Sequence, residues 1–156
     1  MEPWGYLVAV SLGLSSDLAS WAVAKSPRPP LSLELAGCAD DVTCRLRSHG
    51  FDDPAVLRDF LNLLRVAAHE VDQETLVNLV NYPLTLYDQG IPQKTYTTPQ
   101  ELRQDFAAIF TPAVLDAMRD ARYEFLFVNA EGAMLGNGEV WLRPTEAGIR
   151  IYALNP

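Results

Sequence analysis

Three carboxylates lie on or beside predicted strands and are the residues best placed for general acid–base chemistry: Asp88, Glu124 and Glu139. A carboxylate does such work when apolar surroundings raise its pKa toward neutrality. Asp88 stands before a glutamine–glycine pair, which is typical of a turn-forming aspartate. Glu139 alternates with Val140 and Leu142 and should point away from both, either to solvent or into a pocket as a lone acid. Asp88 and Glu139 are therefore the candidate acids.

The sequence gives less support for catalysis by histidine or by a bound metal ion than for carboxylate chemistry. His49 precedes the first long predicted helix, and His69 lies at its end, where the helix dipole favours a cation. No histidine falls on a predicted strand, so a serine–histidine–aspartate triad would lack its base. The sequence contains neither a glycine-rich phosphate loop nor metal ligands at suitable spacing. These features weigh against catalysis, and we expect no cofactor and no metal.

The helices that must position these residues have clear start signals. Asp53 precedes Pro54, and apolar residues then recur at helical spacing as far as Val71. Asp72 opens a shorter helix that Pro83 should end. Two further starts follow, a capping box over residues 98–101 and a threonine–proline pair at 111–112, and they predict helices with buried faces that include Phe106 and Phe110.

Strands are predicted by alternation between turn residues. The first covers residues 82–88 with a short partner at 94–97, and a meander of three strands follows at 124–128, 133–142 and 149–154. Gly136-Asn-Gly138 interrupts the middle strand of the meander. We expect a bulge that bends one long strand, with a separate turn as the alternative.

This order of elements resembles the cystatin-like, nuclear-transport-factor-2-like superfamily over roughly residues 51–156. Phe127-Val-Asn129 followed by residues 134–142 also resembles a strand pair of small exported bacterial proteins of that fold. The resemblance implies an α+β fold in which helices pack on a strongly curved, mostly antiparallel sheet. That sheet forms a cone-shaped roll with an opening at one end.

The resemblance also implies where a ligand would bind. Ketosteroid isomerase and scytalone dehydratase use the cone for catalysis, and most other relatives bind ligands or partners there. No residue here matches the catalytic motif of those enzymes. Aromatic residues that could line the cone, or form its core instead, are Tyr82, Tyr87, Tyr96, Phe106, Phe110, Phe127, Trp141 and Tyr152.

The N-terminal 37 residues differ from the rest in composition. Residues 1–24 resemble a secretory signal, with an apolar run from Tyr6 to Leu14 and small residues at Ala22 and Ala24, although no basic residue precedes the run. The run is too short to span a bilayer as a helix, and an N-terminal helix packed on the domain is the alternative. Residues 25–37 form a proline-rich linker, and residues 38–156 a single domain.

Two cysteines support the export hypothesis. Cys38 and Cys44 have a spacing that allows a small disulfide loop, with two reduced thiols as the alternative. Because a disulfide and a signal both imply an oxidising compartment, we expect a periplasmic or secreted protein, and otherwise a cytoplasmic one.

Charge excludes one class of partner. The formal net charge is −8 and no cluster of basic residues offsets it in the sequence, so nucleic acid is not expected as a partner. An integral membrane protein is not expected either. The sequence predicts a non-catalytic exported binding module for a small apolar ligand or a protein partner, a class that includes proteins of the immunity or inhibitor type. The alternative is a small isomerase or dehydratase with a carboxylate in the cone, and a homodimer through the sheet face is compatible with both.

Overall fold

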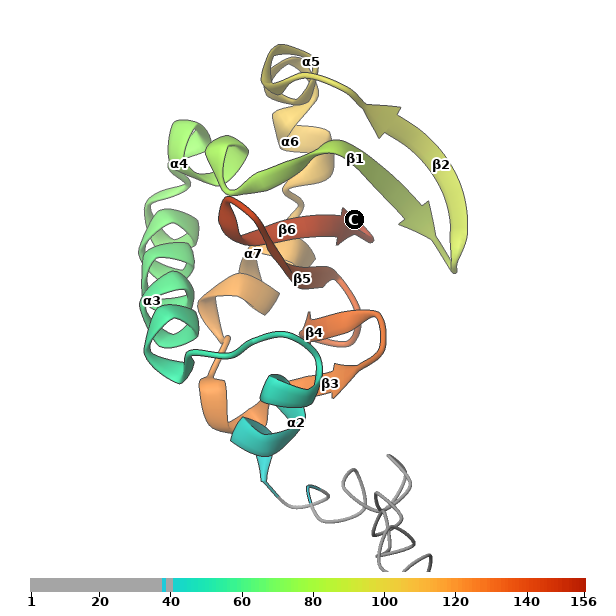
Figure 1. Cartoon of the computed structure of the whole chain (residues 1–156). Coiled ribbons are helices and arrows are strands. Elements are labelled where there is room, and N and C mark those ends of the chain that lie inside the picture. The colour runs from blue at the N-terminus through green and yellow to red at the C-terminus, as the bar shows by residue number, and fades with distance from the viewer. Residues whose placement is uncertain (1–37, 39–40) are drawn as a thin grey trace, which may run out of the picture.

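A computed structural model describes residue 38 and residues 41–156 of the chain. These residues form an α+β unit with six α-helices, one short 3-10 helix and a six-stranded mixed sheet (Figure 1). The signal-like segment 1–24 and the linker 25–37 lie outside the described residues.

The helices form three groups along the chain. One precedes the first strand, a second follows the first hairpin, and the 3-10 helix leads into the last four strands. Their bounds are α2 Val42–Ser48, α3 Pro54–Glu70, α4 Gln73–Asn78, α5 Pro99–Gln104, α6 Phe106–Ile109, α7 Pro112–Arg119 and η2 Tyr123–Phe125.

Local capping explains where these helices begin. Asp53 accepts from the amide of Ala55 at the start of α3, and Thr111 accepts from Val114 at the start of α7. The predicted capping box is present at α5, where Thr98 accepts from the amide of Glu101. The Glu101 carboxylate reaches back one residue further than expected, to the amide of Thr97.

The sheet has the strand order β2-β1-β6-β5-β4-β3 and is open at both edges. β1 and β6 are parallel, and every other neighbouring pair is antiparallel, so the sheet is mixed but mostly antiparallel as expected. The strand bounds are β1 Val80–Asp88, β2 Ile91–Tyr96, β3 Phe127–Asn129, β4 Gly132–Leu135, β5 Val140–Thr145 and β6 Gly148–Leu154.

Several predicted boundaries are wrong. The second helix ends at Asn78 because the chain already enters β1 at Val80, before Pro83. The helix predicted from residue 98 onward breaks at Asp105. The strand predicted over 124–128 is η2 followed by the short β3, and the predicted long strand is two strands, β4 and β5, joined by a turn. The last part of the chain therefore holds four strands, not three.

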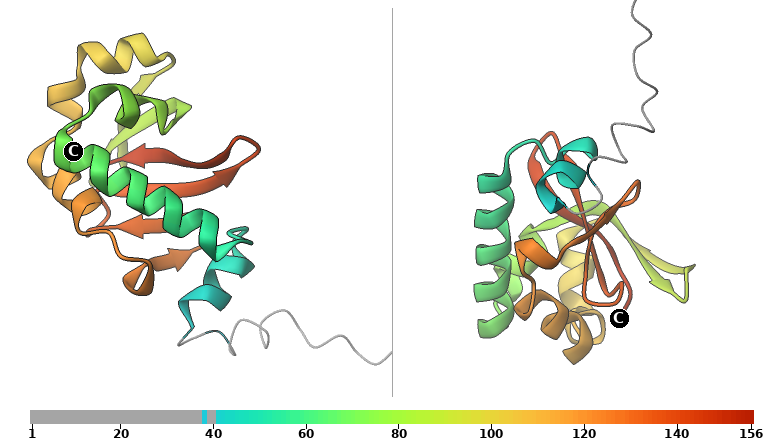
Figure 2. Two further views of the ribbon diagram at one scale, coloured as in Figure 1. Left: turned by 90° about the vertical axis from the view of Figure 1, so that its left-hand side faces the viewer. Right: turned by 90° about the horizontal axis from the view of Figure 1, so that it is seen from below.

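The helices gather on one side of the sheet, and the β1–β2 hairpin projects on the other side (Figure 2). Fully buried aliphatic side chains fill the space between helices and sheet. The side chains of successive strand residues alternate between the core and the outer face, since Val140 and Leu142 are wholly buried while Trp141 between them is partly exposed. The core members that are least exposed include Leu57, Leu64, Leu76, Leu84, Leu102, Ile109, Met118, Leu142, Ile151 and Leu154.

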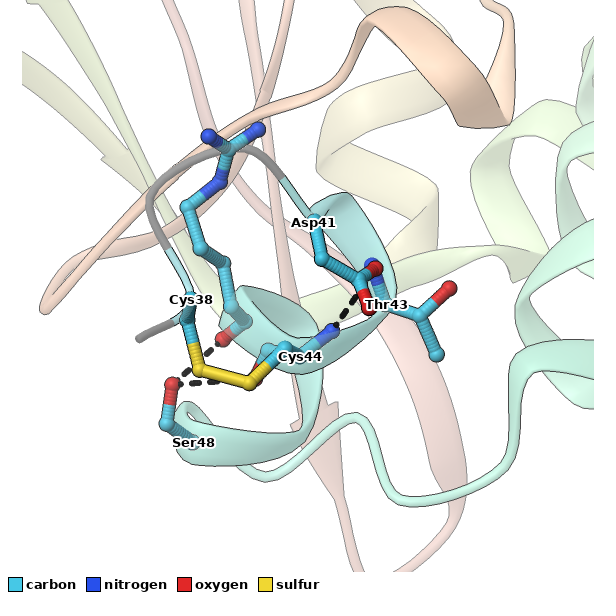
Figure 3. Close-up of a disulfide and its surroundings, with 6 residues drawn as sticks. Cys38, Asp41, Thr43, Cys44 and Ser48 are labelled. Carbon is cyan, nitrogen blue, oxygen red and sulfur yellow. Dashed lines mark hydrogen bonds between the residues drawn. A yellow bond between two sulfur atoms is a disulfide. The ribbon is translucent and has the colours of Figure 1, made fainter. Parts of the chain in front are cut away.

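The predicted disulfide between Cys38 and Cys44 is confirmed, with 5.2 Å between the two Cα atoms (Figure 3). It closes onto the first turn of α2, whose N-cap Asp41 accepts from the amides of Thr43 and Cys44. At the other end of α2, the Ser48 hydroxyl donates to the carbonyl of Cys44 at 3.2 Å. The cross-link therefore attaches the chain before α2 to a capped helix of the domain.

Removing this disulfide is expected to lower the free energy of unfolding by about 2–3 kcal/mol, because a short loop is no longer closed in the unfolded chain. Urea denaturation of the Cys38→Ala, Cys44→Ala double variant measures the effect. Wild-type protein in reductant should lose the same amount, and reductant should not change the double variant. An unfolding midpoint of the wild type that does not respond to reductant would contradict the expectation.

Candidate binding site

The face of the sheet turned away from the core carries a row of large apolar side chains. Phe127 on β3 pairs with Met134 on β4, Met134 pairs with Trp141 on β5, and Trp141 pairs with Ala153 on β6. Since paired residues of neighbouring strands point to the same face, these four form one continuous strip across the sheet.

A β-bulge adds a tyrosine to this strip. Trp141 pairs with Ala153, whereas the next residue, Leu142, pairs with Ile151, so Tyr152 is the additional residue on β6. A bulge of this kind interrupts the alternation and turns two successive residues toward one face. The core face of β6 keeps Ile151, and Tyr152 is half-buried on the outer face.

Met134, Trp141, Tyr152 and Ala153 of this strip line a cleft of about 640 Å³ on the outer face. Tyr87 from β1 forms another wall, and the rim is polar. The cleft therefore combines an aromatic floor with a hydrogen-bonding rim, which is the usual constitution of a binding site. The rim residues are Gln89, Glu131, Asn137, Glu139 and Asn155.

Arg143 fixes the orientation of Tyr152. Its guanidinium lies 4.1 Å from the centre of the Tyr152 ring, and its Nη2 donates to the carbonyl of Glu131 at 3.3 Å. Burial raises the pKa of Tyr152, and the nearby Arg143 opposes this effect. The phenol consequently stays protonated at neutral pH and is a hydrogen-bond donor at the edge of the cleft.

The turn between β4 and β5 forms one end of the cleft, and here the expected bulge is wrong. Gly136 and Gly138 have φ values of 66° and 114°, and Leu135 pairs directly with Val140, so the residues between them form a separate turn. The Glu139 carboxylate accepts from the amide of Asn137, which tightens the turn. Asn155 donates its backbone amide to the Glu139 carbonyl at 2.9 Å, so the end of β6 holds the turn in place.

The structure brings together four of the residues that the sequence singled out, Tyr87, Trp141, Tyr152 and Glu139, in this one cleft. Phe127 lies beside it and lines a neighbouring groove of about 410 Å³, where Glu139 also forms part of the wall. Met134 was missed, although its position between Ala133 and Leu135 in an alternating strand would have placed it on the outer face.

The remaining aromatic candidates lie elsewhere. The Tyr82 hydroxyl donates to the Val77 carbonyl at 3.0 Å, and burial raises its pKa to about 12. The Tyr96 hydroxyl donates to the carboxylate of Asp105 at 2.8 Å. Phe106 and Phe110 stack on one another with 4.5 Å between ring centres. These four side chains connect β1, β2 and the helices and are absent from the lining of the cleft.

Asp88, the other candidate acid, lies at the exposed end of β1, where it pairs with Ile91 across the hairpin. It is not part of the cleft lining, although Gln89 beside it is. Within residues 38 and 41–156, no group of three or more histidine, cysteine, aspartate or glutamate side chains could hold a metal ion. No helix among the same residues is long and apolar enough to cross a membrane.

Comparison with known proteins found no matching family model, no similar curated protein and no similar solved structure.

Proposed function

We propose that this protein is a non-catalytic, exported binding module, of the immunity or inhibitor type, whose outer-face cleft holds an apolar part of a protein partner. The observation that carries the proposal is the strip of Met134, Trp141 and Tyr152 on a sheet face whose opposite side packs on the core. Tryptophan, tyrosine and arginine are the residues most enriched at the energetic centres of protein interfaces. Trp141, Tyr152 and Arg143 occur together here.

The extent of the apolar surface favours a protein partner over a small apolar ligand. A volume of about 640 Å³ would accommodate a small molecule. The apolar surface continues beyond the cleft, however, to Phe127 and Phe125, whose side chains are 52% and 79% exposed. A contiguous exposed apolar patch rimmed by polar residues is typical of a protein contact. A second copy of the chain is one such partner, and it would make a homodimer.

Export and the cone-shaped roll are further parts of the proposal. The Cys38–Cys44 disulfide supports export, because such bonds persist in oxidising compartments such as the periplasm. The signal-like segment 1–24 supports it from the sequence. The likeness to the cystatin-like, nuclear-transport-factor-2-like layout is supported by helices on one side of a mixed, mostly antiparallel sheet.

The alternative function, a small isomerase or dehydratase, would use Glu139, because this carboxylate lies on the wall of the cleft. The contact of its carboxylate with the amide of Asn137 favours a role in holding the turn. Asp88 is exposed at the end of β1 and lies outside the lining of the cleft. The geometry thus favours binding over catalysis.

Replacing Trp141 with alanine is expected to weaken partner binding by at least about tenfold, because truncating a central interface aromatic commonly costs 2 kcal/mol or more. The measurement is affinity capture from exported proteins of the source organism, quantified by mass spectrometry. Light scattering of the purified protein tests whether the partner is a second copy.

Val66→Ala is the matched control, because Val66 is an exposed apolar residue on α3, outside the lining of the cleft. It should retain whatever partner the wild type retains. A partner held equally well by wild type and by Trp141→Ala would refute the proposed interface.

A further inference from the structure

A second concavity, of about 350 Å³, lies between α3 and the segment that joins α7 to η2. Its wall on α3 is formed by Arg58, Asn62 and Arg65, which are four and three residues apart and therefore share one face of the helix. Arg122 and Glu124 from the facing segment complete the polar lining. We call this concavity the arginine groove.

The charge of the arginine groove is opposite to that of the chain. The whole protein has a net charge of −8, whereas the groove has three arginines and one glutamate. Arg58, Arg65 and Arg122 have no carboxylate of the described residues within ion-pair distance. Their cationic charge is therefore not neutralised from within the described part of the chain.

Two arginines outside the groove, Arg103 and Arg119, are ion-paired. Arg103 contacts Glu74 with both nitrogens at 2.8 Å, and Arg119 contacts Asp116 at 2.8 Å. The contrast matters because an arginine already engaged with a carboxylate has little left to offer a ligand. Arg58, Arg65 and Arg122, which have no such ion pair, lie together where the surface is concave.

Two of the groove arginines are held in place by contacts that leave their charge available. The Arg58 guanidinium lies 4.0 Å from the centre of the buried Tyr123 ring, and the Tyr123 hydroxyl shares a hydrogen bond of 2.9 Å with Thr43 on α2. Arg65 donates its Nε to the backbone carbonyl of Arg119 at 3.3 Å. Side chains that are already ordered lose less conformational entropy when a ligand binds.

We infer that the arginine groove binds a small organic anion that carries carboxylate or phosphate groups. Guanidinium groups form paired hydrogen bonds to the two oxygens of such groups, and lysine cannot reproduce this geometry. The volume is at the lower end of the range of small-molecule sites, which suits a compact metabolite. Arg58 and Arg65 are two helical turns apart on one face of α3, so the groove suits a ligand with more than one anionic group. This site is independent of the outer-face cleft.

Isothermal titration of the full-length protein tests the inference, with citrate as the carboxylate probe and pyrophosphate as the phosphate probe. Sodium chloride at matched ionic strength controls for screening. We expect at least one of the two anions to bind with a stoichiometry of one. The Arg58→Gln, Arg65→Gln double variant should weaken that binding at least tenfold.

Arg150→Gln is the control for loss of an arginine outside the groove, because Arg150 lies on β6 and is not part of the groove lining. It should change the affinity less than twofold, as should Trp141→Ala in the cleft. Should the double variant not fold, the same titration followed by NMR of the arginine side chains in wild-type protein gives a second readout. The Nε–Hε signals of Arg58 and Arg65 should then shift with the anion and not with chloride.

Three results would overturn the inference. The first is that citrate and pyrophosphate give no more titration heat and no larger NMR shifts than chloride does. The second is that a folded double variant binds the anion with unchanged affinity. The third is that the protein binds an oligoglutamate peptide but responds to neither small anion. None of these results tests the proposed protein interface at Trp141, so failure of the anion site would leave the proposed function unaffected.

Discussion

Replacing Gly132 with alanine is expected to destabilise the protein by about 4 kcal/mol, because it combines backbone strain with a steric clash. Gly132 opens β4 with a φ of 135°, a conformation that residues with a Cβ rarely adopt. A Cβ at this position would also collide with the carbonyl oxygen of Leu142, which is backbone and cannot rotate away. Both the strain and the clash must be relieved by separating β4 from β5.

Gly148→Ala separates these two causes. Gly148 also begins a strand after a hairpin turn and has a φ of 97°, but nothing lies within 4 Å of the position of its Cβ. It should cost only about 1 kcal/mol, the strain alone. Chemical denaturation of both variants measures the difference, and equal losses of stability would show that the predicted clash does not occur.

Truncating Leu64 to alanine is the second large effect, with an expected loss of between about 2 and 5 kcal/mol. Leu64 is wholly buried on the face of α3 that packs on the core. Removing its isobutyl group forfeits the transfer free energy of the side chain and leaves a cavity that the neighbouring side chains only partly fill. The free energy of unfolding in urea is the measurement.

Leu63→Ala is an unusually close control, because it makes the same change at the next residue of the same helix. Leu63 is 48% exposed, so its truncation should cost less than about 1 kcal/mol. The helix propensity change is identical in the two variants and cancels in the comparison. Similar losses from both would mean that α3 does not bury the face described here.

Helix starts could be predicted from the sequence because capping is local. Asp53, Asp72 and Thr111 each accept from an amide two or three residues ahead, so residue type and spacing alone carry the signal. The residues at which helices end could not be predicted in the same way. The strand that begins at Val80 pairs with Ile151 at the far end of the chain, and this pairing, not the nearby Pro83, decides where the helix ends.

The turn at Gly136–Gly138 shows where local patterns are ambiguous. Glycines with positive φ occur in bulges and in tight turns alike. The distinction depends on the bond from Asn137 to the Glu139 carboxylate and on the bond from Asn155 to the Glu139 carbonyl. The latter joins residues brought together only by the β5–β6 pairing.

Only part of the candidate site could be predicted from the sequence, because residue type does not fix the face of the sheet on which a side chain lies. Aromatic composition alone does not say which side of the sheet a ring occupies, so Tyr82 and Tyr96 were grouped with Tyr87 and Trp141. Strand alternation separates the two sides for Trp141, but it fails at Tyr152, where the bulge shifts the register. The arginine groove could not be predicted, because its two walls meet only through the packing of α3 against the chain around η2.

Trp141 is an intrinsic fluorescence probe of the outer face of the sheet. The chain has three tryptophans, and Trp4 and Trp21 both fall within the signal-like segment 1–24. In protein that lacks this segment, all indole fluorescence comes from a partly exposed ring at the floor of the cleft. Its emission maximum and its quenching by iodide then follow occupancy of the cleft directly, without any added dye.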